Sequence, residues 1–560
     1  MTDMAGPARG RHASARRDGL VPKLLTVLRQ GYSLADLRSD ALAGLTVAIV
    51  ALPLAMALAI ASGTTPERGL VTVVVAGLLI SALGGSRSQI GGPTGAFVVV
   101  VANVISQHGF DGLVIATLMA GLMLIAAGAA RLGSLMRYIP EPVITGFTAG
   151  IALIIFSSQV KDFFGLSIAH LPADFIGEWE TLIANFGTLS VATTGVSLAA
   201  LGLILALRRF APKVPGFLVA VVLGAVAVTL LQLPVATIGT RFGELNGAIP
   251  VPSLPVLSFS RIAELFPSAV TIAFLAGVES LLSAVVADGM TGGRHRPNAE
   301  LVAQGVANTA SALFGGLPAT GAIARTATNI RAGGRTPMAG VFHALFVLAV
   351  MLLLAPLAVY IPLASLAAIL MVVAWNMSEM DKMRHLMSAP LGDRFLMILT
   401  LVLTVAVDLT VAIGAGVVFA AMIFMHRMAE SASIAVVPDA AEETDTRASL
   451  PPGVEAFAVR GPLFFGAAAR LSDVLDQIGQ PPRVFILRME EVPLIDATGV
   501  AALQSFLRRC ESAGTKVILS GVKPTTRDVM LRMGLAPEPG KVAFVPDFDA
   551  ALLRAAAVPA

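Results

Sequence analysis

The sequence predicts an all-α polytopic membrane domain followed by a small soluble α/β domain. The chain has 560 residues, of which 56% are hydrophobic and only 13% are charged. A protein folded in water cannot hide that much apolar surface, so most of the chain is expected to lie in lipid. A short motif recurs 226 residues downstream inside the apolar part, and the composition turns polar after about residue 428. These observations predict two membrane repeats and a separate tail.

Residues 1–38 are predicted to form a cytoplasmic arm. The arm is basic through Arg9, Arg11, Arg16 and Arg17. No short apolar core with a cleavage site follows, so we expect no cleaved signal peptide. The next apolar run, at 42–62, has the roughly 20 residues that a bilayer-spanning helix needs.

A transmembrane domain is predicted at 39–428. Its apolar runs lie at 43–62, 68–83, 111–130, 140–158, 188–208, 214–233, 264–287, 299–314, 338–358, 362–376, 391–407 and 409–426. Two further stretches, at 94–107 and 320–331, are too short to cross a bilayer at about 1.5 Å per residue. Each follows Gly/Pro-rich chain, the pattern of a half-helix that starts near mid-membrane. The fourteen segments divide into repeat one, at about 39–235, and repeat two, at about 262–428.

The two half-helices begin with the same tripeptide. Thr94-Gly95-Ala96 and Thr320-Gly321-Ala322 lie 226 residues apart. Lys and Arg favour cytoplasmic loops, so their positions indicate the direction of each repeat. Arg131 and Arg137 precede the first copy of a Tyr-Ile-Pro turn, at 138–140, whereas the second copy, at 360–362, has no basic residue near it. The two repeats are therefore predicted to be inverted.

Inversion brings the N-termini of the two half-helices together near the middle of the membrane. Each offers unpaired backbone N–H groups and roughly half a positive charge, so the pair forms a predicted anion site. The small residues Gly95, Ala96, Gly321 and Ala322 let a ligand approach the backbone closely. The alternative is that these residues only permit tight helix packing.

Arg325 lies one turn into the second half-helix, opposite Val99 in repeat one. A buried arginine in lipid costs at least about 2.5–3.5 kcal/mol, so it needs a partner or a function. We expect it to attract the anion to the half-helix tips. The alternative is a structural salt bridge to Glu279 or Asp288.

Glu279, which the 226-residue offset relates to Pro53, lies inside the apolar run at 264–287. A carboxylate at that depth requires a proton or another cation, so Glu279 is predicted to couple transport to a proton or cation. Ser283, four residues later on the same helical face, is predicted to share that ion. The alternative is a hydrogen-bonded acid that only holds neighbouring helices together.

Other kinds of chemistry find no support in the sequence. No His/Cys cluster, nucleotide-binding loop or Ser/His/Asp arrangement occurs, so we expect no enzyme, no ATP-driven pump, no metal and no cofactor. The single cysteine, Cys510, excludes an internal disulfide. Most basic residues lie in loops between apolar runs, where they set topology, and no nucleic-acid partner is expected.

Residues 429–450 are predicted to be a linker and 451–560 a small α/β domain. Strands are expected at 454–460, 483–490, 516–521 and 542–545, and helices at 467–478, 499–513, 524–533 and 547–556. Such alternation is typical of a largely parallel sheet. Asp496 and Thr498 precede the second helix and either cap it or form a regulatory contact.

Several motifs resemble the sulfate permease family, also known as SulP or solute carrier family 26. They lie at 52–63, 91–96, 315–318 and 332–336, with Asp496-Ala-Thr-Gly499 resembling its STAS domain. The resemblance covers about residues 35–556. It implies the seven-plus-seven inverted repeat of the uracil permeases and a homodimer with cytoplasmic STAS domains. The implied substrate contacts are Met56, Thr94, Gly95, Ala96, Phe97, Thr320, Gly321, Ala322, Ile323 and Arg325.

Within the family, the segments 288–296 and 374–379 are most similar to the bacterial aerobic dicarboxylate transporters. This implies proton-coupled uptake of succinate, fumarate or aspartate by an elevator-type movement of a core domain. The alternatives are a sodium-coupled bicarbonate or sulfate transporter, and a membrane receptor that signals through STAS. We expect the bacterial inner membrane, both termini in the cytoplasm, and a cytoplasmic protein partner for STAS.

Overall fold

The computed structural model describes residues 18–134, 140–168, 171–172, 174–212, 214–407, 409–431, 433–436, 450–464 and 481–558. Tyr138 and Ile139 of the first Tyr-Ile-Pro turn lie outside these residues, as do most of the predicted linker and the predicted helix at 467–478. Two compact units share the chain, Met1–Val417 and Val418–Ala560.

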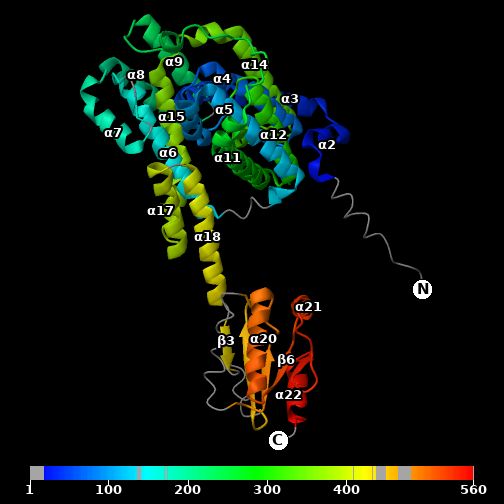
Figure 1. Ribbon diagram of the computed structural model, residues 1–560. Coiled ribbons are helices and arrows are strands. Elements are labelled where there is room, and N and C mark those ends of the chain that lie inside the picture. The colour runs from blue at the N-terminus through cyan, green and yellow to red at the C-terminus, as the bar shows by residue number, and fades with distance from the viewer. Residues whose placement is uncertain are drawn as a thin grey trace. The chain divides into compact units, whose positions relative to one another are not determined.

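The first unit is helical, and most of its helices match predicted apolar runs (Figure 1). In repeat one they are α3 (Leu34–Ala61), α4 (Pro66–Leu83), α5 (Val98–Ala129), α6 (Glu141–Phe164), α7 (Phe175–Ala184), α8 (Val191–Phe210) and α9 (Gly216–Leu230). After the short α10 (Ile238–Phe242), repeat two contains α11 (Phe259–Thr291), α12 (Pro297–Leu313), α13 (Ile323–Arg331), α14 (Met338–Ala358), α15 (Leu363–Met377), α16 (Met380–Leu386), α17 (Leu391–Ala406) and α18 (Leu409–Ser431). The arm adds η1 (Asp18–Leu20) and α2 (Lys23–Gln30).

Nine helices within the described residues are long and apolar enough to cross a membrane. The remaining apolar helices are shorter, as with Gly216–Leu230. Local sequence signals set several boundaries. The first long helix, α3, begins at a capping box in which Ser33 and Asp36 bond each other's backbone N–H groups, an arrangement that satisfies donors at the start of a helix.

The first predicted half-helix differs from expectation in one respect. The prediction separates a segment at 94–107 from another at 111–130, whereas a short turn, η2 (Gly95–Phe97), leads into one assigned helix, α5. Gly109 interrupts α5 with a φ of 69° and a ψ of −178°. Glycine adopts this backbone conformation without the Cβ clash that other residues suffer. The helix is therefore interrupted at a single residue, Gly109, where the prediction placed a loop between two helices.

The chain before each half-helix is extended, and the two extended pieces pair with each other. Strand β1 (Gly91–Gly92) runs antiparallel to β2 (Thr320–Gly321), with Gly91 opposite Gly321 and Gly92 opposite Thr320. Continued by one residue, this register brings Pro93 opposite Ala319, the two residues that the 226-residue offset relates. The repeat relationship is therefore a local pseudo-twofold at this point, as inverted repeats require.

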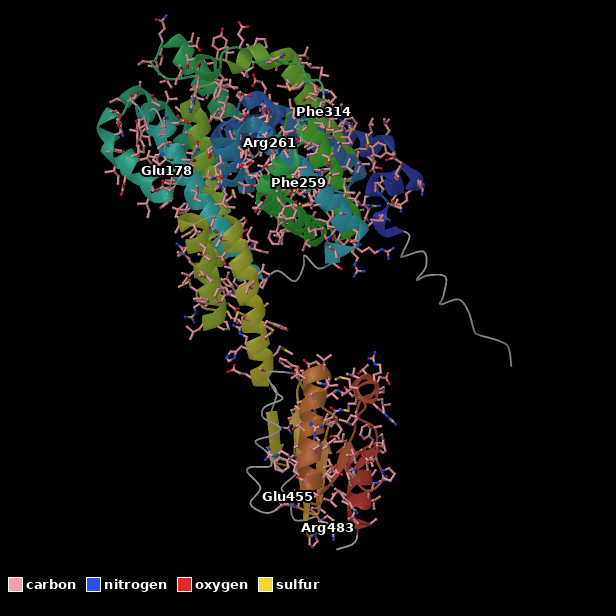
Figure 2. All side chains as sticks on the ribbon, in the orientation of Figure 1. Glu178, Phe259, Arg261, Phe314, Glu455 and Arg483 are labelled. Atoms are coloured by element: carbon pink, nitrogen blue, oxygen red, sulfur yellow. The ribbon has the colours of Figure 1, made fainter. Side chains whose placement is uncertain are left out.

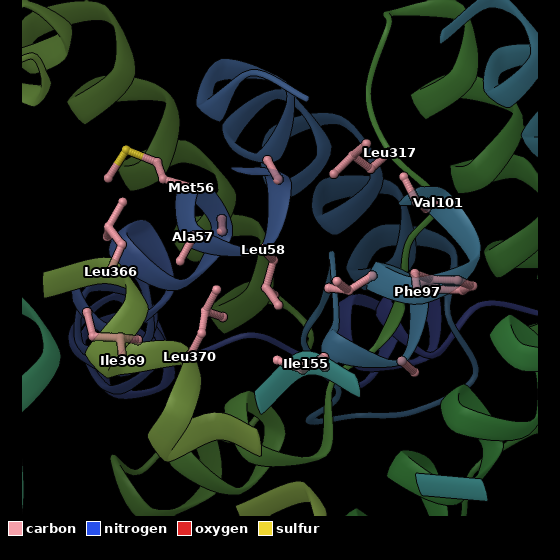
Figure 3. Close-up of a cluster of buried hydrophobic side chains, with 14 of the residues drawn as sticks. Met56, Ala57, Leu58, Phe97, Val101, Ile155, Leu317, Leu366, Ile369 and Leu370 are labelled. Carbon is pink, nitrogen blue, oxygen red and sulfur yellow. The ribbon is translucent and has the colours of Figure 1, made fainter. Parts of the chain in front are cut away.

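Long helices of the two repeats pack against each other around these strands. α12 packs along α5 and α4, and α14 packs along α3 and α4. Figure 3 shows part of the buried hydrophobic cluster, to which Phe97, Val101 and Leu317 belong. Phe97 is only 2% exposed, so its ring forms part of the packing at the start of the first half-helix.

The second unit contains a five-stranded sheet of order β3-β4-β5-β6-β7. Its strands are β3 (Ser433–Val436), β4 (Val454–Arg460), β5 (Val484–Arg488), β6 (Lys516–Ser520) and β7 (Val542–Val545), and its helices are α20 (Ala497–Ser512), α21 (Pro524–Arg532) and α22 (Phe548–Ala556). All neighbouring strands pair in parallel except β3 with β4. The predicted mostly parallel sheet is confirmed.

Alternating residues of β5 separate two cores. Phe485 and Leu487 face the cluster that contains residues of α20, whereas Val484 and Ile486 face the cluster that contains residues of α22. Helices on both faces are the usual arrangement for parallel strands, which are buried on both sides. The strand β3 was not predicted, because it lies inside the stretch assigned to the linker.

Candidate functional site

The predicted anion site lies where α11 meets the start of the first half-helix. Thr94 Oγ1 donates a hydrogen bond to Glu279 Oε2 at 2.8 Å. These two residues are 185 positions apart in the chain, and the contact joins the two repeats. A hydroxyl group beside a partly buried carboxyl group provides a place where a proton or a small cation can be held.

Arg325, in the first turn of α13, lies next to the paired strands and is 2% exposed. Its Nη2 donates to the carbonyl oxygen of Pro93 at 2.9 Å. Its Nε and Nη1 are buried without a hydrogen-bond partner. A buried guanidinium with unused donors is costly, and a site that binds an anion accounts for it.

A glycine on the opposite strand makes room for this guanidinium. A Cβ atom at Gly92 would collide with Arg325 Nη1, and the φ of Gly92 is 153°. Both features favour glycine at this position. The position that corresponds to Gly92 in repeat two is Pro318, so only one of the two half-helices is built to receive an arginine here.

The alternative of a salt bridge to Arg325 is not what the structure shows. Among the ion pairs of the described residues, none involves Arg325, and Asp288 pairs with His295 at 2.7 Å instead. Glu279 still interacts electrostatically with Arg325. The two opposite charges therefore interact without forming an ion pair among the described residues.

Several predicted contact residues are engaged in backbone pairing or packing. Gly321 belongs to β2, and the amide of Ala322 donates to the carbonyl oxygen of Ile90 at 2.8 Å. A Cβ atom at Gly95 would meet the side chains of Met377 and Ile155. These contacts support the packing explanation for the small residues. The N–H groups of 323–325, in the first turn of α13, have no partner within the helix.

Three further residues predicted to contact the substrate have surroundings of their own. Thr320 Oγ1 donates to Ala276 O at 2.9 Å. Met56 lines an apolar cavity of about 540 Å³ that none of Thr94, Glu279 and Arg325 lines. Ile323, at the start of α13, is 37% exposed.

Ser283 does not share its partner with Glu279. Its Oγ lies 3.1 Å from Thr326 Oγ1, and Thr326 in turn accepts the amide of Ile90 at 3.1 Å. Glu279 and Ser283 lie one turn apart on α11, as their four-residue spacing predicts, but Ser283 contacts the second half-helix whereas Glu279 contacts the first. Sequence reasoning missed Thr326 and Ile90, because Ile90 takes part through its backbone amide and Thr326 is one of several polar residues in α13.

The predicted regulatory residues of the tail have clear structural positions. Asp496 caps α20, since its Oδ1 accepts the amide of Gly499 at 2.7 Å. Thr498 is exposed. The cap accounts for Asp496, while a regulatory role for either residue stays a prediction.

Family profiles match nearly the whole chain. The Sulfate permease family matches residues 37–400, and the STAS domain matches residues 447–550. The chain belongs to the sulfate permease family. It is therefore a secondary anion transporter with a STAS domain, and it is not an enzyme.

Relatives in this family carry two kinds of substrate in their names. YvdB of Bacillus subtilis, provisionally named a sulfate transporter, is 42% identical over 93% of this chain and 98% of its own. The bicarbonate transporter BicA of Picosynechococcus is 31% identical over 88% of this chain and 90% of its own. The predicted membership of a dicarboxylate subgroup is not supported, because these relatives favour the alternative of a sulfate or bicarbonate carrier.

Solved structures confirm the fold. The murine solute carrier 26 family member A9, in an inward-facing state, has a TM-score of 0.88 at 18% identity, covering 100% of this chain and 97% of its own. The transmembrane domain of a cyanobacterial BicA has a TM-score of 0.62 at 34% identity, covering 68% of this chain and 99% of its own. The helical membrane domain with its α/β tail is thus established.

Proposed function

We propose that this chain is a secondary active carrier of small oxyanions, with sulfate as the first candidate substrate. The anion binds between Arg325, the N–H groups at the start of α13 and the tip of the first half-helix near Thr94. Support comes from the 42% identity to a relative named for sulfate and from the chemistry of the site. Guanidinium and helix N-termini both suit oxyanions.

One observation carries this proposal: Arg325 is buried with two of its nitrogen groups unpaired. An arginine with a purely structural role in a membrane is expected to donate hydrogen bonds from all its N–H groups to protein acceptors. Here only Nη2 does so, through Pro93. The remaining donors, held next to the half-helix tips, give an oxyanion both charge and hydrogen bonds.

Glu279 is proposed to carry the coupling cation. Its carboxyl group accepts a hydrogen bond from Thr94 and forms no ion pair within the described chain. Binding of a proton there removes a negative charge next to the anion site, so anion and proton favour each other's binding. Sodium is the second candidate, because a carboxylate and a hydroxyl oxygen are also suitable ligands for a hard cation.

Bicarbonate is the second candidate substrate, favoured by the 31% identity to BicA. Both anions suit the same hydrogen-bond donors, so a transport measurement is needed to decide which one is the substrate. Purified protein in proteoliposomes would be given labelled sulfate, bicarbonate or succinate under a pH gradient, a sodium gradient or neither. Sulfate uptake that depends on one of the gradients is the expected result, whereas uptake of succinate alone would contradict the proposal.

Several finer properties belong to the same proposal. The core containing α3, α4, α5, α11, α12, α13 and α14 would move the substrate past the remaining helices in an elevator-type step. The protein would act as a homodimer in the bacterial inner membrane with both termini in the cytoplasm. Thr498, exposed on the STAS domain, would be available to a cytoplasmic partner protein.

A further inference from the structure

The buried face of α12 is polar, although none of its residues was assigned to the site. Glu300, Gln304, Asn308 and Ser311 recur every three or four positions, so they share one face of the helix. All four are 0% exposed. Polar side chains in a membrane interior are costly unless they are bonded, so specific partners are expected for each.

Glu300 and Gln304 hold the extended chain before the first half-helix. Glu300 accepts the amide of Gly85 at 2.8 Å through Oε2 and the hydroxyl of Ser280 at 2.9 Å through Oε1. Gln304 Nε2 donates to Ser280 Oγ at 2.8 Å, and Gln89 Nε2 donates to the same oxygen at 2.7 Å. This chain is thereby attached to α12 at Gly85 directly and at Gln89 through Ser280.

Asn308 and Ser311 hold the extended chain before the second half-helix. Asn308 Oδ1 accepts the amide of Ala319, and Asn308 Nδ2 donates to the carbonyl oxygen of Ala319, both at 2.8 Å. One side-chain amide therefore satisfies both backbone groups of Ala319, as a neighbouring strand would. Ser311 Oγ donates to Leu317 O at 2.7 Å.

Ala319 lies immediately before β2, at the centre of the pseudo-twofold that relates the two extended chains. The β1–β2 register, continued by one residue, places it opposite Pro93. Pro93 in turn accepts the hydrogen bond from Arg325 Nη2. A shift of Ala319 is therefore expected to shift Pro93, and with it the acceptor that holds the Arg325 guanidinium.

We propose that Asn308 is a positioning residue of the anion site. It fixes the extended chain before the second half-helix at the centre of the pseudo-twofold, and thereby sets where Arg325 and the half-helix tips lie. This inference rests on the proposed function, because it assigns Asn308 an effect on anion affinity. Glu300, Gln304 and Ser311 extend the same support to either side, but none of them bonds Ala319.

The substitution Asn308→Asp keeps the size of the side chain and removes its two donors. A carboxylate would then face the carbonyl oxygens of Ala319 and Gln304, both of which now accept from Asn308 Nδ2. We expect the Kd for sulfate to rise at least about tenfold, while turnover at saturating sulfate changes less. Asn103→Asp, the same change at an exposed position of the first half-helix, is the matched control and should leave the Kd unchanged.

A second measurement separates the failure of this inference from the failure of the proposed function. Hydrogen exchange of the amides at 317–322, followed without any anion, should be faster in Asn308→Asp and unchanged in Asn103→Asp. Wild-type exchange and a wild-type Kd in folded Asn308→Asp overturn the inference. Faster exchange in a protein whose wild type binds no tested anion supports the role of Asn308 in placing the strands and overturns the proposed function.

A milder variant keeps the test decisive if Asn308→Asp does not fold. Asn308→Ser shortens the side chain, so it cannot reach both backbone groups of Ala319 at once. Its exchange at 317–322 is expected to rise in the same direction by a smaller factor. Wild-type exchange in folded Asn308→Ser would overturn the inference on its own.

Discussion

The two half-helices occupy equivalent places in the repeats but differ in what they contribute. The first begins at Thr94 and supplies a hydroxyl group, whereas the second carries Arg325, whose equivalent in repeat one is Val99. Their surroundings differ in the same sense, since Gly92 admits the guanidinium where repeat two has Pro318. A duplicated scaffold provides the geometry, and one copy provides the charges.

The same asymmetry holds for the helices next to them. Glu279 on α11 corresponds to Pro53 on α3, so both charged residues of the site come from repeat two. Repeat one contributes neutral partners to these charges: the hydroxyl of Thr94 bonds Glu279, and the carbonyl of Pro93 bonds Arg325. An inverted pair of half-helices is therefore necessary for the site but does not define its chemistry.

The largest effect is expected for Arg325→Gln. Loss of the charged donor at the tips should reduce sulfate uptake into proteoliposomes at least about 100-fold, since charge-assisted hydrogen bonds in a buried site are strong. Arg331→Gln, on the same helix but exposed, is the control and should transport normally. Full uptake by Arg325→Gln would mean that the two half-helices are functionally alike.

The double variant Val99→Arg/Arg325→Val moves the charge from one half-helix to the other. We expect it to stay inactive, because Pro318 stands where Gly92 admits the guanidinium in the native arrangement. Uptake would be measured alongside detergent-extracted yield, so that loss of protein is not mistaken for loss of transport. Recovery of transport would show that the scaffold is more symmetric than its side chains indicate.

Glu279→Gln tests whether the second charged residue couples transport to a cation. We expect sulfate to bind within about threefold of the wild-type Kd, while uptake no longer responds to the pH or sodium gradient that drives the wild type. Glu264→Gln, at a half-exposed carboxylate on the same helix, serves as the control. Gradient-driven uptake at the wild-type rate would remove Glu279 from the coupling step.

Thr94→Val removes the one side-chain bond that joins Glu279 to the first half-helix. A buried hydrogen bond to a charged group contributes about 1.5–3 kcal/mol, and part of that loss should appear as an approximately tenfold weaker response to the driving cation. The comparison is Thr328→Val, whose hydroxyl only bonds its own helix at Ala324 O. Equal effects of the two substitutions would contradict a specific role for Thr94.

The smallest predicted effect is a pH dependence of stability that arises from Glu178 in α7 of repeat one. Burial raises the pKa of Glu178 to about 7, with a further contribution from Asp174, and Glu178 is 6% exposed. Figure 2 marks its position. Since the folded state holds this proton more tightly than the unfolded state, stability should fall as pH rises from about 4.5 to 7. α16, between the corresponding helices of repeat two, contains no buried residue.

Glu178→Gln should flatten that part of the pH dependence of thermal unfolding by about 1–3 kcal/mol. Asp381→Asn, at an exposed position of α16, should leave it as in the wild type. An unchanged pH profile in Glu178→Gln would show that burial of this carboxyl group does not destabilise the fold.

Much of the fold follows from the sequence, because apolar length and periodicity are set locally. The membrane helices, the two broken segments and the order of strands and helices in the tail were predicted from such signals. The break at Gly109 was placed in a loop, since a single glycine inside an apolar run gives little warning of a kink. The strand β3 was missed because its four residues lie in the polar stretch that was assigned to the linker.

Less of the candidate site was predictable, for a physical reason. The sequence singled out Thr94 through the repeated tripeptide, and Glu279 and Arg325 as charges out of place in lipid, but it did not indicate which partner each one has. Arg325 bonds a backbone carbonyl, and backbone partners leave no trace in residue identity. Asn308 was overlooked for the same reason, since its partner is the backbone of Ala319.

The central claim is that Arg325 holds the anion at the paired half-helix tips. Binding of labelled sulfate to the purified full-length protein, compared between wild type, Arg325→Gln and Arg331→Gln, tests it most directly. The account predicts one shared Kd for wild type and Arg331→Gln, and no saturable binding for Arg325→Gln. Saturable binding by Arg325→Gln at the wild-type Kd would contradict it.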